Sequence, residues 1–200
     1  EKAVLEQISR LSSESRHPNT MDIDQVSTKE VLTKINQLDQ AVPEVVSRCI
    51  PDIALAVDAV VSAFKKGGRL IYIGAGTSGR LGVLDAVECP PTFSVGQEQV
   101  KALIAGGESA MYKAVEGAED DLSLAERELK TINLSKSDVL VGIAASGRTP
   151  YVIGGLKFAK DIGVFTVAIA CNSASVITQI ADVGICADVG ADKRIHAPQR

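Results

Sequence analysis

The residues best suited to chemistry form a loop of glycines and hydroxyls, Gly74-Ala75-Gly76-Thr77-Ser78-Gly79-Arg80. Glycines let a backbone turn sharply and bring its N–H groups close to a ligand. A helix that we expect to begin near Ser78 would point its amino end, with unpaired N–H groups and a positive dipole, at the same place. Thr77 and Ser78 add hydroxyl donors. The loop therefore predicts an anion site held by Gly76, Thr77, Ser78 and Gly79.

The spacing of this loop is also that of a dinucleotide-binding motif, G-x-G-x-x-G, which is weak evidence when it stands alone. A nicotinamide or flavin site needs an acidic residue about 20 positions further on, at the end of the next strand, to hold the ribose. Here the next expected strand ends later, in Gly106-Gly107-Glu108. The hydroxyls of Thr77 and Ser78 also suit a compact phosphate monoester better than a pyrophosphate. A glycine-rich turn that binds nothing remains the alternative.

A second loop has the same character and strengthens the prediction. The apolar run Val139–Ala145 leads into Ser146-Gly147-Arg148-Thr149, and Pro150 follows at the expected start of a helix. Taken singly, this segment is a good helix cap. In an open parallel sheet, however, ligands bind at the carboxyl ends of the strands. We therefore expect the four residues 146–149 to hold the same phosphate from the other side.

Strands and helices alternate along the chain and would position both loops. Short apolar runs predict strands at Arg69–Ile73, Val100–Ala105, Val139–Ala144, Phe165–Ala170 and Val183–Cys186. Helical patterns predict helices at Ser78–Val87, Ser109–Lys130, Tyr151–Lys160 and Ser175–Ala181, the second with some interruption near Gly117. Strands this apolar, separated by helices, are typical of a parallel sheet covered on both faces. We predict an α/β fold, a doubly wound parallel sheet with an N-terminal helical segment before it.

The N-terminal segment carries its own helix signals. Ser27-Thr28-Lys29-Glu30 has the spacing of a capping box. Apolar residues from Ile53 to Phe64 recur at helical spacing, Pro51 suits the first position of that helix, and Gly67-Gly68 would end it.

Composition and charge exclude several classes of function. The 200 residues are 46% hydrophobic, enough for one core, and the net charge of −4 provides no basic field for nucleic acid. The four cysteines have neither close C-x-x-C pairing nor metal-ligand spacing, which indicates free thiols and no metal site. The sequence shows no leader peptide and no run long enough to span a bilayer. We expect a cytoplasmic protein without a membrane or nucleic-acid partner.

The two loops belong to a longer series of motifs, which are Ser13–Arg16, Pro18–Thr20, Asp22–Asp24, Gly74–Arg80, Leu84–Thr92, Ala105–Glu108, Ala114–Asp120 and Gly142–Tyr151. The two loops resemble those of SIS (sugar isomerase) domains, and the whole series resembles the N-acetylmuramic acid 6-phosphate etherases. The similarity covers about residues 11–190.

The resemblance implies a lyase that cleaves the D-lactyl ether of N-acetylmuramic acid 6-phosphate without a metal or redox cofactor. The products would be N-acetylglucosamine 6-phosphate and D-lactate, formed by elimination and then addition of water. Such chemistry needs an acid and a base with separate duties. By resemblance, Glu88 is the acid that protonates the departing lactyl oxygen. Glu119 is the base at C2 and for the water, although Glu116 and Asp120 lie beside it in sequence.

Glu88 poses a geometric problem. It lies ten residues beyond Ser78, so a straight helix would place it roughly 15 Å from its own phosphate loop. Either the chain bends back, or Glu88 reaches the site of a neighbouring subunit. The second alternative predicts a homodimer with active sites near the subunit interface.

The resemblance divides the chain into an N-terminal polar and helical arm over residues 1–50, a SIS domain over 51–190, and a tail over 191–200 that departs from the family's pattern. Members of this family continue past Val189-Gly190-Ala191 through a lysine-bearing segment into a helical region. A shortened lyase and a sugar-phosphate sensor that has lost part of the catalytic apparatus are both compatible with this departure. An aldose–ketose isomerase would use the same loops, but the context of Glu88 and Glu119 matches it less well.

Overall fold

The computed structural model describes residues 17–173 and 175–190. The elements are η2 (Pro18–Thr20), α2 (Thr28–Asp39), α3 (Val42–Lys65), β1 (Leu70–Gly74), α4 (Gly76–Phe93), β2 (Val100–Ile104), η3 (Glu108–Met111), η4 (Ala118–Asp120), α5 (Leu124–Thr131), β3 (Val139–Ile143), α6 (Pro150–Asp161), β4 (Phe165–Ala170), α7 (Val176–Ile180) and β5 (Val183–Cys186). The motif Ser13–Arg16 and the tail over 191–200 lie outside the described residues.

The strands form one parallel sheet in the order β2-β1-β3-β4-β5. This confirms the predicted α/β fold with a doubly wound sheet. The bounds of β4 and β5 are those expected from the sequence, β2 and β3 each end one residue earlier, and β1 is shifted by one residue at both ends. The strands could be predicted because they are short, mostly apolar runs, and the central ones, β1 and β3, are buried along nearly their whole length.

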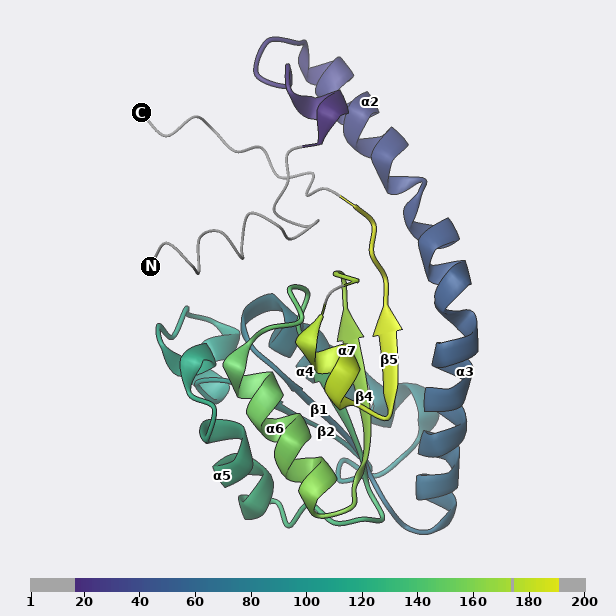
Figure 1. The fold of residues 1–200 in the computed structure, drawn as a ribbon, viewed down its shortest axis with the longest axis vertical. Coiled ribbons are helices and arrows are strands. Elements are labelled where there is room, and N and C mark those ends of the chain that lie inside the picture. The colour runs from purple at the N-terminus through teal and green to yellow at the C-terminus, as the bar shows by residue number, and fades with distance from the viewer. Residues whose placement is uncertain (1–16, 174, 191–200) are drawn as a thin grey trace.

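Helices cover both faces of this sheet. Ile71 and Ile73 of β1 pack with α5, α6 and α7 in one buried cluster. Leu70 and Tyr72 of the same strand point to the other face, where they pack with residues of α3 and α4. The division follows from the two-residue period of a strand. Figure 1 shows α5 and α6 in front of the sheet, α4 behind it and α3 running along β5.

The capping box at the start of α2 forms as predicted. The Ser27 side chain accepts from the Glu30 amide, and the Glu30 carboxylate accepts from the Ser27 amide at 2.9 Å. None of the residues of α2 is buried, and Figure 1 shows this helix extending beyond the sheet. Its apolar side chains are therefore only partly covered: Val31, Ile35 and Leu38 are half-buried, and Leu32 is exposed.

The helix before the sheet begins earlier than predicted. Its first turn contains Pro43, and Pro51 lies in the helix interior instead of at its start. Val45 and Cys49 are buried, and the Cys49 thiol donates to the carbonyl oxygen of Cys186 at 3.2 Å. This packing against β5 carries the helix through Pro51, although an interior proline removes one backbone hydrogen bond.

The helix predicted over residues 109–130 is interrupted near Gly117 as expected, but the helical part is much shorter than predicted, because only α5 is α-helical there and the rest forms η3, η4 and irregular backbone. Gly117 has a φ of 75°, a left-handed conformation that an α-helix does not contain. Asp121 accepts a hydrogen bond from the Ser123 amide at 2.8 Å, a local turn that competes with a continuous helix. The break leaves Glu119 near the carboxyl end of the sheet.

α4 is longer than the predicted helix over residues 78–87. It runs unbroken from Gly76 past Glu88, and Pro90 and Pro91 fall in its last turn. Ser94 then ends it with a left-handed φ of 55°. The chain therefore does not bend back between the first loop and Glu88.

A buried ion pair holds β1 to the start of β3. The carboxylate of Asp138 accepts from the Arg69 guanidinium at 3.0 and 2.8 Å, from the Arg69 amide at 2.9 Å and from the Ser135 amide at 2.9 Å. Burial alone would raise the pKa of Asp138, but the bonds from Arg69 and Ser135 hold it below its usual value. These contacts fix the two strands whose opposite ends carry the loops.

We expect Asp138→Ala to lower the free energy of unfolding at pH 7 by about 3 kcal/mol, because it removes a buried carboxylate that accepts from the Arg69 side chain and from the Arg69 and Ser135 amides. Since the folded-state pKa is depressed, the carboxylate stabilises the fold above about pH 4 and loses this effect as the pH falls through the folded-state value. Urea unfolding at pH 7 and at pH 3 measures the change. The gap between wild type and variant should narrow at pH 3. Asp161→Ala, at an exposed position, is the control; a loss as large as that of Asp138→Ala would contradict this account.

Candidate functional site

The two loops predicted to bind an anion lie side by side. β1 and β3 are neighbours, with Gly74 opposite Ile143 at their carboxyl ends. The helices that follow them, α4 and α6, leave toward opposite faces of the sheet. This is a topological switch point, the place where open α/β sheets bind ligands.

The first loop is shaped by a very close approach of α4 to β1. A Cβ atom on Gly79 would lie 2.7 Å from the Gly74 carbonyl oxygen, so only glycine fits there. The first hydrogen bond of the helix runs from the Gly79 amide to the Ala75 oxygen at 3.1 Å, and Ala75 offers no side-chain cap. The amides of the first turn, around Thr77, are thus available to an anion. Gly76 and Thr77 are exposed, while Ser78 is half-buried and Gly79 is buried.

The second loop is held from the side by the start of α7. Gly147 has a φ of 69°, and its carbonyl accepts from the Ile177 amide at 3.1 Å. Ser146 accepts from the Arg148 amide at 3.3 Å. Ser146, Arg148 and Thr149 are half-buried and Gly147 is buried. The loop therefore presents a serine, an arginine and the start of α6 beside the first loop.

A third loop, which was not predicted from the sequence, supports the second. After β4, Asn172 and Ser175 are buried polar residues, and the Cys171 amide donates to the Ala145 oxygen at 2.9 Å. Ser175 accepts from the Thr178 amide at 3.3 Å and caps α7. Burial, and after it the charge of Asp188, raise the pKa of the Cys171 thiol, so this group stays protonated. The sequence did contain a signal for this loop, because β4, like β1 and β3, is followed by hydroxyl side chains and then by a helix.

A pocket of about 160 Å³ opens beside the first loop. The end of β1 and the first turn of α4 form one wall, and the segment from η3 to η4 forms the other. Its lining residues are Ala75, Gly76, Arg80, Ala105, Ala110, Lys113, Ala114, Val115, Glu116, Gly117 and Glu119. Two of the predicted site residues, Gly76 and Glu119, thus line the same small pocket. Glu116 lies there too, whereas Asp120 does not line it.

Glu88 lies elsewhere. It is on the exposed face of α4, at helical spacing from Leu81 and Leu84, which are 56% and 58% exposed. Roughly 15 Å of straight helix separate it from Ser78. Within one protomer, then, Glu88 is not part of the pocket that contains Glu119.

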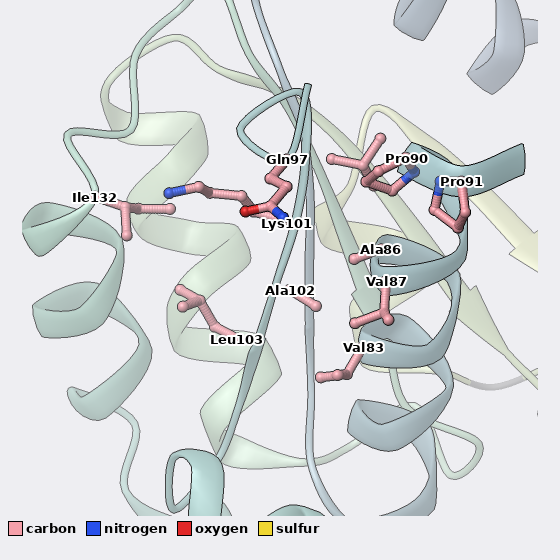
Figure 2. A pocket seen from close by; sticks show the side chains of 11 residues that line it. Val83, Ala86, Val87, Pro90, Pro91, Gln97, Lys101, Ala102, Leu103 and Ile132 are labelled. Carbon is pink, nitrogen blue, oxygen red and sulfur yellow. The ribbon is translucent and has the colours of Figure 1, made fainter. Parts of the chain in front are cut away.

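A larger pocket of about 550 Å³ lies between α4 and the edge strand β2, as Figure 2 shows. Its walls are mainly apolar, from Val83 and Val87 of α4 to Leu103 and Ile132. Lys101 is its one charged lining residue and pairs with Glu98 at 2.6 Å. Such a pocket lacks the converging polar groups that bind a charged small molecule. The small pocket beside the first loop is therefore the candidate site, although it has the smaller volume.

Two further observations concern the described residues only. No group of three or more His, Cys, Asp or Glu side chains among residues 17–173 and 175–190 is arranged to hold a metal ion. No helix in that part of the chain has the length and apolar character needed to cross a membrane.

Comparison with known families gives a match over more than half of the chain. A family model described as the glucokinase regulatory protein N-terminal SIS domain matches residues 52–160. Solved structures resemble the fold: a phosphoheptose isomerase from Neisseria gonorrhoeae has a TM-score of 0.59 at 17% identity, covering 80% of this chain and 85% of that one. One from Francisella tularensis has 0.58 at 19% identity, covering 78% and 85%. At these identities the likeness concerns the fold alone.

Similarity to curated proteins is much higher. An N-acetylmuramic acid 6-phosphate etherase 2 of Vibrio cholerae is 55% identical over 190 residues, which are 95% of this chain and 62% of that protein. An N-acetylmuramic acid 6-phosphate etherase of Colwellia psychrerythraea is 56% identical over 189 residues, 94% of this chain and 61% of that protein. The chain therefore spans about three fifths of the length of these relatives.

The fit of Gly147 against Ser175 can be tested by comparing Gly147→Ala with Gly163→Ala. Both glycines have positive φ, 69° and 78°, so both variants share a backbone strain of about 1–2 kcal/mol. Only at Gly147 would the new Cβ meet an obstacle, the Ser175 Oγ at 2.1 Å, whereas nothing lies within 4 Å at Gly163. We expect Gly147→Ala to lower the free energy of unfolding by about 2 kcal/mol more than the control. Equal losses in urea unfolding would contradict the packing described for the second loop.

Proposed function

This chain belongs to the family described as the glucokinase regulatory protein N-terminal SIS domain, and on that premise we propose that it acts as a carbon–oxygen lyase on a phosphorylated amino sugar. The substrate is N-acetylmuramic acid 6-phosphate, the compound in the names of the relatives that are 55% and 56% identical. The products are N-acetylglucosamine 6-phosphate and D-lactate, so the reaction serves peptidoglycan amino-sugar recycling.

The observation that carries the proposal is the shared lining of the small pocket. Gly76 belongs to the phosphate loop and Glu119 is the candidate base, and the two face the same pocket of about 160 Å³. A phosphate bound at the amides around Thr77 and at Ser146 would place the sugar carbons of the same molecule next to Glu119. Phosphate binding and proton abstraction thus become functions of one site.

The proposed chemistry needs two proton-transfer groups and no redox step. Glu119 removes the C2 proton beside the open-chain aldehyde, the bond between C3 and the lactyl oxygen breaks, and Glu88 gives its proton to the departing oxygen. Water then adds at C3 of the unsaturated sugar as Glu119 assists, and a proton returns to C2. Each step is acid–base chemistry that carboxyl groups can perform.

We infer that Glu88 acts in the site of a second subunit, because α4 is unbroken between Gly76 and Glu88. The face of α4 that carries Glu88 also carries Leu81 and Leu84, each more than half exposed. α3 covers the same face of the sheet and exposes Ile50 and Val57 at 57% and 52%. Apolar surface of this extent on two neighbouring helices supports burial by a symmetric copy.

Cytoplasmic location is part of the proposal. All four cysteines, Cys49, Cys89, Cys171 and Cys186, are free thiols in the structure. Free thiols persist where the redox poise keeps them reduced, as in the cytosol.

A second candidate function is a sugar-phosphate-binding regulator without catalysis. The observation that favours it is the description of the matching family model, which is that of a regulatory protein. The regulator would bind N-acetylmuramic acid 6-phosphate through the same loops and release no D-lactate.

We expect Glu119→Gln to slow the release of D-lactate from N-acetylmuramic acid 6-phosphate by about 10²–10⁴-fold, because the base at C2 is lost. Binding of N-acetylglucosamine 6-phosphate, measured by calorimetry, should change little. Asp120→Asn is the matched control, since Asp120 is adjacent in η4 but does not line the pocket. A Glu119→Gln protein with near-normal turnover would exclude this residue as the base.

Mixing two inactive variants tests whether the site is shared. In a dimer of Glu88→Gln and Ser78→Ala subunits, one of the two sites combines an intact loop with an intact Glu88. Random 1:1 mixing should therefore restore about a quarter of wild-type activity, since half of the dimers are hybrids with one working site each. The mixture would stay inactive after subunit exchange if Glu88 served its own subunit.

A further inference from the structure

The pocket beside Glu119 contains charges that the proton transfers do not use. Arg80 and Lys113 line it together with Glu116 and Glu119. Before a ligand binds, the two cations and the two carboxylates balance. When Glu119 takes up the C2 proton, that carboxylate becomes neutral and the negative charge passes to the substrate, so Arg80 and Lys113 then face an anionic ligand with Glu116 as the other charged group of the lining.

Arg80 is held in a position to bind an anion. Its Nε donates to the carbonyl oxygen of Met111 in η3 at 3.1 Å, which fixes the guanidinium across the pocket wall. An arginine has five N–H donors in a planar fork that matches a carboxylate, and this bond uses one of them. Within residues 17–173 and 175–190, Arg80 and Lys113 make no recorded ion pair with a protein carboxylate. Lys113 is exposed, on the opposite wall of the pocket.

The remaining walls are small and apolar. Ala105 and Ala110 are each 4% exposed, and Ala75 and Ala114 lie beside them. Methyl side chains on these walls leave room for a group with a methyl of its own. The pocket thus pairs two cations with an alanine-lined surface in a volume of about 160 Å³.

We propose that this pocket binds the lactyl group of the substrate, with Arg80 and Lys113 on its carboxylate and the alanines around its methyl. This inference rests on the proposed function, which supplies the substrate. A lactyl ether carries a carboxylate and a methyl on one carbon, and both features have a counterpart in the lining. The acetamido group of the sugar is neutral, so it would not pair with the charges of Arg80 and Lys113. The phosphate has its own donors in the two loops. Arg80 and Lys113 are therefore specificity-determining residues.

Two ligands that differ only in the lactyl group provide the test. N-Acetylmuramic acid 6-phosphate and N-acetylglucosamine 6-phosphate are titrated by calorimetry into protein carrying Glu119→Gln, which stops turnover. Lys113→Gln and Arg80→Gln are then added singly to that background. Lys157→Gln, at an exposed lysine of α6, is the control. Lys113 is itself exposed, so its variant should fold even if Arg80→Gln does not.

We expect the Glu119→Gln protein to prefer the lactyl-bearing ligand. Each pocket variant should weaken binding of that ligand about tenfold or more, the effect of losing a charged hydrogen bond. Binding of N-acetylglucosamine 6-phosphate and the control variant should stay unchanged. Equal weakening of both ligands, or no preference at the outset, would overturn the lactyl assignment and leave the phosphate site standing. Failure of both ligands to bind would overturn the proposed function with it. The protein could also prefer the lactyl-bearing ligand through Lys113 while the wild type releases no D-lactate. That result would support the assignment of the pocket and contradict the proposed lyase activity.

Discussion

The close approach of α4 to β1 is the constraint on which the rest of the structure depends. Gly74 and Gly79 touch backbone to backbone, and a Cβ atom on Gly82 would lie 2.9 Å from the Cβ of Tyr72. Because α4 packs this close to β1, its amino end lies at the carboxyl end of the sheet, beside the loop that follows β3. The same packing places Leu84 and Glu88 on the face of α4 that points away from the sheet. One packing contact therefore sets both the position of the first loop at the carboxyl end of the sheet and the direction in which Glu88 points.

Local patterns in the sequence predicted the strands and the two loops well, because strand burial and glycine-rich turns are decided by neighbouring residues. They failed where distant contacts decide. α3 continues through Pro51 because Cys49 packs against β5, which lies far along the chain. Over residues 109–130 the interruption near Gly117 was predicted, but the turn at Asp121 extends it much further than the local composition indicated. The place of Lys113 in the small pocket was not predicted, because the segments that line this pocket meet only after folding.

Under the proposed function, one protomer supplies only part of the catalytic site. The two loops, Glu119 and the small pocket lie at the carboxyl end of the sheet, whereas Glu88 faces outward among apolar side chains. The face of the sheet under α5, α6 and α7 is well covered, and the exposed apolar surface gathers on α3 and α4 of the other face. A partner there would bury this surface and complete the acid–base pair in the same step, so that assembly and catalysis would depend on the same helix face.

The central claim is that a sugar phosphate binds where the loops after β1 and β3 meet. A crystal structure of the protein with N-acetylglucosamine 6-phosphate tests it most directly. We predict the phosphate within hydrogen-bonding distance of the Thr77 and Ser78 amides and of the Ser146 side chain, with the sugar turned toward Glu119. A phosphate found in the apolar pocket between α4 and β2, or at any place away from these loops, would contradict the account.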